Sequence, residues 1–194
     1  MREIIKLAGI LFVITAIAAV LLGFTNMATA DKIEQQLIQE NINARKAVLP
    51  KATEFKELED EELNNTIQKD FQIIEEVYEG LDEEELVGYT FKTTPKGFGG
   101  QMVINVGISL DGKVSGIKVV SHTETPGLGA KSTEENYQNQ YKDKPIENPL
   151  EVVKSSPSSE NEIEAITGAT VTTNGVTDGV NIAIDLFKEY LKED

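Results

Sequence analysis

The most apolar stretch of the chain lies near its N-terminus, where Leu7 to Phe24 is almost wholly hydrophobic. No charged residue occurs between Lys6 and Asp31. A helix rises about 1.5 Å per residue, so this stretch spans about 27 Å, close to the roughly 30 Å thickness of a bilayer's hydrocarbon core. The pattern therefore predicts a single transmembrane helix within residues 1–30.

Two kinds of N-terminal segment share this pattern. Ala28–Ala30 resembles a signal-peptide cleavage site, but the apolar run exceeds the ~7–15 residues of a signal-peptide core, which favours a retained anchor. Arg2 and Lys6 precede the run, so the positive-inside rule places the N-terminus in the cytoplasm. Both interpretations put the rest of the chain outside the cytoplasm. A retained anchor makes the chain a single-pass protein of the inner or plasma membrane.

The next segment, residues 31–70, is rich in Glu, Gln and Lys. It is predicted to be a helical, acidic stalk or linker that Pro50 interrupts. The acidic run from Glu57 to Glu62 is typical of a solvated face.

From Phe71 onward the spacing changes from helical to alternating. Strands are predicted over Phe71–Tyr78, Leu86–Thr93, Met102–Leu110 and Val114–Val120, with a hairpin turn at Asp111–Gly112. A final helix is predicted from the apolar spacing of Val176, Val180, Ala183, Ile184, Phe187 and Leu191. The predicted fold class is α+β, with an antiparallel sheet and packed helices over residues 71–194.

Composition narrows the chemistry of the domain. The net charge is −15, and because the first thirty residues carry Arg2 and Lys6 against Glu3, the part after Ala30 carries about −16, so nucleic acid is excluded as a partner. There is no cysteine, which rules out disulfides, zinc–thiolate sites and iron–sulfur ligation within the chain. His122 is the single histidine, so a multi-histidine metal site is also excluded. Redox chemistry in this chain requires an organic cofactor.

The sequence from Glu164 to Gly175 concentrates Thr, Gly and Ala just before the final helix. Thr172 or Thr173 is predicted to cap that helix, and the unpaired N–H groups of a helix start attract phosphate. Gly168 and Ala169 leave the backbone open to close approach by a ligand. An ordinary capped turn would have the same sequence.

A second motif follows the last predicted strand of the sheet. Pro126–Gly127 is a turn signal, and Gly129 adds another flexible position to the loop that starts at Ser121. Such a loop can lay backbone N–H groups and the Leu128 side chain along a flat ring. His122 and Glu124 are candidates either for contacts with that ring or for fixing the loop. Leu128 packs either against the ring or under the loop.

Both motifs resemble those of the FMN-binding domain family. Its members include the RnfG subunit of the Rnf ion-translocating electron-transport complex and the C subunit of the sodium-pumping NADH:quinone reductase. Thr167–Thr170 is similar to the flavinylation motif Ser/Thr-Gly-Ala-Thr, with Glu164 where the family usually has Asp, and Glu124–Gly129 is similar to the family's flavin loop. Lys96–Gly100 looks more like the Rnf form.

The resemblance implies a cofactor and its ligands. It implies covalent FMN, held by a phosphoester to Thr170 that a flavin transferase makes from FAD. The expected cofactor-binding residues are Thr167, Gly168, Ala169, Thr170, Thr172 and Thr173 around the phosphate, and Glu124, Thr125, Pro126, Gly127, Leu128 and Gly129 along the ring. No catalytic residue and no metal ligand are expected.

The resemblance also implies a role in the cell. It implies an electron-carrying subunit of a membrane-bound Rnf-type complex that couples ferredoxin/NAD electron transfer to Na⁺ or H⁺ translocation, with no independent substrate turnover. The partners would be other membrane, iron–sulfur and flavin subunits. Two alternatives stay open: a stand-alone extracytoplasmic FMN carrier for another reductase, and a flavin-free anchored assembly module.

Overall fold

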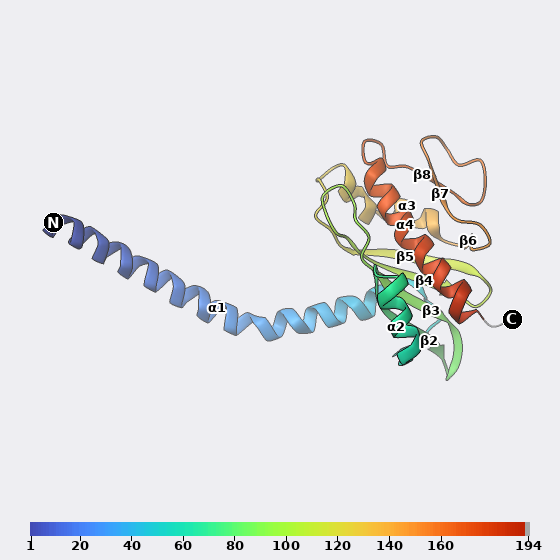
Figure 1. The fold of residues 1–194 in the computed structure, drawn as a ribbon, viewed down its shortest axis with the longest axis horizontal. Helices are drawn as coiled ribbons and strands as arrows, with labels where there is room; N and C mark the ends of the chain where they lie inside the picture. Colours follow the sequence, from blue (N-terminus) through green and yellow to red (C-terminus); the bar gives the residue numbers. More distant parts are fainter. Residues whose placement is uncertain (193–194) are drawn as a thin grey trace. The chain divides into compact units, whose positions relative to one another are not determined.

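The computed structural model describes residues 1–192, the side chains at positions 31, 34 and 37 excepted. Its elements (Figure 1) are α1 Arg2–Val48, β1 Glu54–Glu57, α2 Glu61–Asp70, β2 Ile74–Asp82, β3 Glu85–Thr93, β4 Val103–Ser109, β5 Lys113–Ser121, α3 Glu135–Gln138, β6 Lys144–Pro145, β7 Glu151–Val153, β8 Glu162–Glu164 and α4 Thr170–Leu186. Short 3-10 turns at Gly129–Thr133 and Asn139–Tyr141 flank α3, and π-helical residues Phe187–Leu191 extend α4.

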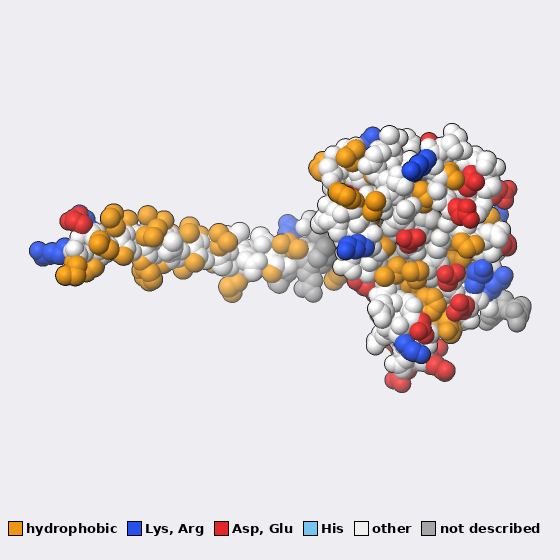
Figure 2. Space-filling model, turned by 45° about the horizontal axis from the view of Figure 1, so that its top comes forward, with side chains coloured by type: hydrophobic (Ala, Val, Ile, Leu, Met, Phe, Trp, Pro, Cys, Tyr) orange, Lys and Arg blue, Asp and Glu red, His pale blue; other side chains and the backbone are white. Residues whose placement is uncertain are grey.

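The chain divides into two compact units. The first, Met1–Glu40, consists almost entirely of the first part of α1. Within it, Arg2–Ala30 contains an 18-residue window that has a mean hydropathy of 2.7 and no buried residue. Figure 2 shows hydrophobic side chains covering this part of the helix. The segment is long and apolar enough to cross a membrane, as its sequence predicts.

The second unit begins at Asn41 and is built on a six-stranded antiparallel sheet in the order β1-β2-β3-β4-β5-β6. The β4–β5 hairpin turns at Asp111–Gly112 as predicted, and Gly112 has a φ of +74°, which glycine adopts without strain. β7 and β8 form a separate parallel pair. The α+β class with an antiparallel sheet is confirmed.

The main core lies between the sheet and α4, which crosses the sheet in Figure 1. Ile104, Val106 and Ile108 alternate along β4 and are fully buried together with Val180 and Ala183 of α4. Burial of these side chains is the largest favourable term for this layer. It also fixes where the first turn of α4 stands relative to the sheet.

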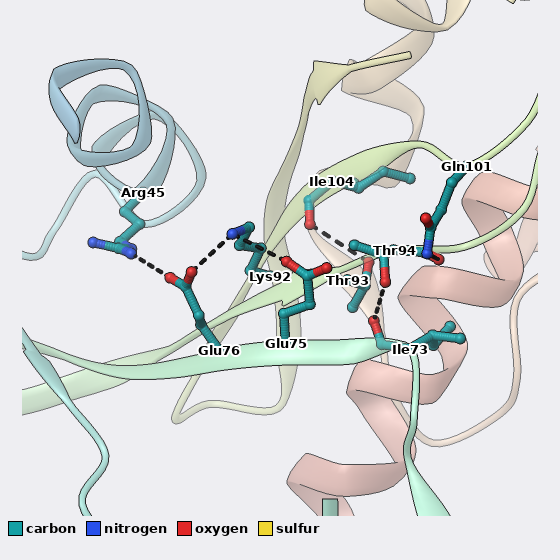
Figure 3. Close-up of polar contacts among 9 residues, drawn as sticks. All are labelled: Arg45, Ile73, Glu75, Glu76, Lys92, Thr93, Thr94, Gln101 and Ile104. Carbon is teal, nitrogen blue, oxygen red and sulfur yellow. Dashed lines mark hydrogen bonds and ion pairs between the residues drawn. The ribbon is translucent and has the colours of Figure 1, made fainter. Parts of the chain in front are cut away.

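The last turns of α1 cover the other face of the sheet. A Cβ at Gly107 would overlap the carbonyl oxygen of Val48, which also accepts a hydrogen bond from the Ser115 hydroxyl. The close approach of the helix therefore requires glycine at position 107. Nearby, Arg45 and Lys92 point toward the Glu76 carboxylate in Figure 3, and each donates to it at 2.8 Å.

The structure differs from the predicted helical stalk over residues 31–70. Residues Glu54–Glu57 form β1, paired with β2, and α2 buries Leu63 and Ile67 in the core. Pairing with a long neighbouring strand outweighs the weak strand propensity of this charged segment. The compact unit that holds the sheet thus begins ahead of position 71. The predicted strand over Phe71–Tyr78 also starts later, at Ile74, and continues to Asp82.

Candidate functional site

The two sequence motifs meet at one pocket of about 420 Å³. The loop after β5 contributes Glu124, Thr125, Leu128 and Gly129, and the start of α4 contributes residues 168–172. Residues 130–166 separate the two motifs along the chain, and the packing of α4 on the sheet brings the motifs together. Pro126 and Gly127 lie exposed in the same loop outside the lining, and Thr167 lines a neighbouring hollow.

Two further lining residues, Phe98 and Val171, are absent from the set expected from the sequence. Phe98 is 73% exposed and Val171 54% exposed, and Leu128 beside them is 44% exposed. The only signal for Phe98 was the glycine-rich run around it, whose turn brings it to the pocket. Three exposed apolar side chains around one hollow are a surface that a ligand or partner would cover.

The start of α4 lacks the side-chain cap that the sequence predicts. Ala169 is the N-cap, with no side-chain hydrogen bond, and Thr172 and Thr173 lie inside the first turns of the helix. The prediction that one of these threonines caps the helix is therefore wrong. The first helical backbone bond runs from the Thr173 N–H to the Ala169 carbonyl, and the N–H groups of residues 170–172 have no partner among the described residues.

The four threonines of this stretch have different surroundings. Thr172 is fully buried and donates to Glu124 Oε2 at 2.7 Å, and Thr173 is fully buried and donates to the Ala169 carbonyl at 3.1 Å. Thr167 is exposed. Thr170 is half-buried in the pocket lining, and its hydroxyl makes no hydrogen bond within the described chain. Of these four threonines, Thr170 is therefore the one that lines the pocket and whose hydroxyl has no hydrogen-bond partner among the described residues.

The loop after β5 is held by its own polar groups. His122 Nδ1 accepts from the Glu124 backbone N–H at 3.1 Å, so His122 fixes the loop. Glu124 is 6% exposed and accepts from the Gly99 N–H at 2.9 Å. Both residues therefore have the loop-fixing contacts that the sequence left as one of two interpretations.

The pocket suits a flat aromatic ligand that carries a phosphate. Its walls present the apolar side chains of Phe98, Leu128 and Val171, and its base is the positive end of α4 with unpaired N–H donors. Gly168, with a φ of +80°, holds the backbone in the left-handed region immediately before the helix. Apolar contact for a ring and amide donors for an anion are the features that FMN requires.

The chain matches two family models and is similar to subunits of known membrane complexes. Residues 97–185 match the family model of the FMN-binding domain, and residues 1–48 match that of the RnfG N-terminal region. The G subunit of the Na⁺-translocating ferredoxin:NAD⁺ oxidoreductase complex of Acetobacterium woodii is 40% identical over 98% of this chain and 95% of its own length. The G subunit of the ion-translocating oxidoreductase complex of Methanosarcina acetivorans is 31% identical over 95% of this chain and 94% of its own.

The fold is also similar to that of a solved structure. The C subunit of the Na⁺-translocating NADH-quinone reductase from Parabacteroides distasonis superposes with a TM-score of 0.54 at 21% identity. The match covers 61% of this chain and 63% of the other. At this level of identity the similarity is evidence for a shared fold alone.

Proposed function

The chain belongs to the family of G subunits of ion-translocating oxidoreductase complexes, and we propose that its pocket holds FMN through a phosphoester to Thr170 Oγ. Within that family it is an FMN-bearing electron carrier of an Rnf-type complex, and other subunits of the complex are its partners. Membership favours this role over a stand-alone carrier and over a flavin-free assembly module.

The observation that carries the proposal is the position of Thr170. Thr170 lines an apolar pocket at a helix start with unpaired N–H groups, and its hydroxyl has no hydrogen-bond partner within the described chain. The hydroxyls of Thr172 and Thr173 are engaged inside the protein. Contacts to the phosphate then fall to the backbone amides of the first turn of α4.

Attachment requires a group transfer without any change of oxidation state. The Thr170 Oγ bonds to the phosphorus on the riboflavin side of FAD, the bond between that phosphorus and the bridging oxygen breaks, and AMP leaves as the hydroxyl proton is lost. A flavin transferase supplies the FAD and the catalysis.

After attachment, the chain's own residues bind and shield the cofactor. Bound FMN supplies one- and two-electron transfer. Phe98, Leu128 and Val171 exclude water from the apolar part of the pocket, while the positive end of α4 stabilises the phosphodiester charge. A covalent tether keeps the cofactor at a site from which free FMN would diffuse away.

We also propose the orientation in the membrane. Arg2 and Lys6 precede the apolar part of α1, so the N-terminus lies in the cytoplasm and the FMN domain outside it. The coupling ion is Na⁺ or H⁺, and the anchor has no charged residue between Lys6 and Asp31 to conduct it. Protease added to intact spheroplasts should digest the domain; a domain protected there, and digested in inverted vesicles, would contradict this orientation.

In-gel fluorescence tests the attachment site. The chain is co-expressed with a flavin transferase, denatured, and viewed under ultraviolet light. Wild type and the Thr177→Val variant, which alters a buried threonine of α4 outside the motif and the pocket, should give a fluorescent band, and Thr170→Ala should give none. A dark wild-type band, or a Thr170→Ala band as bright as wild type, would contradict the proposal.

A further inference from the structure

The Glu124 carboxylate joins two segments that belong to different parts of the pocket. One oxygen accepts from the Gly99 backbone N–H at 2.9 Å, and the other accepts from the Thr172 hydroxyl at 2.7 Å. Gly99 lies in the turn that carries Phe98, and Thr172 lies in the first turns of α4. The buried side chain therefore spans the pocket from its aromatic wall to its helix start.

The backbone closes tightly around this carboxylate. A Cβ at Gly97 would overlap one oxygen of Glu124, and a Cβ at Gly129 would overlap the other oxygen and crowd the Thr172 hydroxyl. Glycine at both positions is what lets the chain surround the carboxylate. Burying a charged group is costly unless hydrogen bonds and opposite charge compensate it, and here two donors and the positive end of α4 do so.

The turn that carries Phe98 depends on the same loop for its position. The Gly97 N–H donates to the Gly100 carbonyl at 2.8 Å, which closes the turn, and the Thr123 hydroxyl donates to the Gly99 carbonyl at 3.0 Å. Thr123 and Glu124 thus hold Gly99 through both its carbonyl and its N–H. The base of the turn at Lys96 and Gly97 lies close against Gly175 of α4, whereas Phe98 and Gly99 at its tip are exposed, so the tip depends on these bonds for its position.

We propose that Glu124 is a positioning residue of the FMN site: it ties the Phe98 turn to the start of α4 and so sets the width of the pocket. The inference rests on the proposed function and goes beyond it, because it assigns Glu124 to the assembly of the pocket through Gly99 and Thr172. The charge of the side chain matters less than its two hydrogen bonds.

The test measures non-covalent FMN affinity in a chain that carries Thr170→Ala, by titration of flavin fluorescence. Adding Glu124→Ala removes both bonds and should weaken binding at least roughly tenfold, because the Gly99 N–H and the Thr172 hydroxyl both lose the buried carboxylate that joins them. Glu124→Gln should stay within roughly threefold of the parent chain, because its amide oxygen can accept from Gly99 and its NH₂ can donate to the Thr172 hydroxyl.

A second pair of variants separates positioning from general destabilisation. Thr172→Val removes the hydroxyl at one end of the connection and should weaken FMN binding. Thr177→Val removes another buried hydroxyl of α4, one that bonds Tyr141 outside the pocket, and should leave the affinity unchanged. Thermal unfolding of the two variants should show comparable losses of stability.

Two results would overturn the assignment of Glu124. One is a Glu124→Ala chain that binds FMN as tightly as its parent, and the other is a Thr177→Val chain weakened as much as Thr172→Val. Attachment of flavin to wild-type Thr170 in the same preparations would show that the proposed function survives such a failure. Wild-type chain that carries no flavin would overturn both.

Discussion

The Arg45 guanidinium donates to the Glu76 carboxylate at 2.8 Å and lies 3.4 Å from the centre of the Tyr78 ring. Arg45 is in the last turns of α1 and Glu76 is in β2, so this pair joins the end of the helix to the sheet. Lys92 of β3 completes the cluster at 2.8 Å from the other carboxylate oxygen (Figure 3). The end of α1 is thus part of the folded domain.

The cluster predicts how acid affects the domain. Burial would raise the pKa of Glu76, but hydrogen bonds and charges from Lys92 and Arg45 outweigh burial and lower that pKa. A lowered carboxyl pKa contributes stability that is present above the ordinary value of 4.5 and is lost as the pH falls through the folded-state pKa. Denaturant unfolding from neutral to acid pH should show that loss, and Glu76→Gln should reduce it. An unchanged acid dependence in Glu76→Gln would contradict this role.

Gly107 and Gly116, paired across β4 and β5, form a matched test of the contact with α1. A Cβ at Gly107 would overlap the Val48 backbone, whereas a Cβ at Gly116 would meet Val48 at an ordinary 3.5 Å. Gly107→Ala should therefore lower the unfolding free energy by about 1–3 kcal/mol, the usual cost of overpacking, and Gly116→Ala should cost far less. Equal losses in chemical denaturation would show that α1 does not press on the sheet at Gly107.

Two buried tyrosines predict sensitivity to alkali. Tyr137 and Tyr141 share a hydrogen bond at 2.8 Å, and burial raises the pKa of Tyr137 to about 12. A raised tyrosine pKa gives stability that is constant below the ordinary value of 10.0 and falls as the pH rises through the folded-state pKa. Ultraviolet titration of the folded domain should show tyrosinate from this pair only well above pH 10.0. Tyrosinate from all five tyrosines near pH 10.0, in folded protein, would contradict their burial.

The start of the second unit predicts where the chain can be shortened. A chain that begins at Asn41 keeps Arg45, Val48 and Leu49, and should be monodisperse without detergent and bind FMN. A chain that begins at Ala52 loses two fully buried apolar side chains, each worth about 1.5–3 kcal/mol, and should be markedly less stable. Gel filtration and thermal unfolding measure both. Equal stability of the two chains would mean that the end of α1 is dispensable.

The regular parts of the fold were predictable because their pattern is local. Alternation along β4 places Ile104, Val106 and Ile108 on the core face, and the spacing of Val176, Val180 and Ala183 gives the buried face of α4. β1 was not predictable, because Glu54–Glu57 has little strand propensity and pairs only through a non-local neighbour. The same holds for the contact of Val48 with Gly107, since nothing near either residue in the sequence signals the other.

The site was predictable in part. Resemblance to the family identified both motifs, and the structure places most of their residues around one pocket. The helix has no side-chain cap because the two threonine hydroxyls bond to other groups in the fold. The Thr172 hydroxyl donates to Glu124, and the Thr173 hydroxyl donates to the Ala169 carbonyl and accepts from the Ile166 N–H. Phe98 was missed because an exposed aromatic in a glycine-rich turn has no sequence pattern that separates a pocket wall from a surface loop.

The central claim is the covalent bond at Thr170, and peptide mass spectrometry of native membranes tests it most directly. Trypsin should release one peptide covering residues 155–188, because no Lys or Arg lies between Lys154 and Lys188. The account predicts that this peptide is heavier by FMN less one water, and that fragmentation assigns the added mass to Thr170. Finding the whole population of this peptide unmodified, or the added mass on another residue, would contradict it.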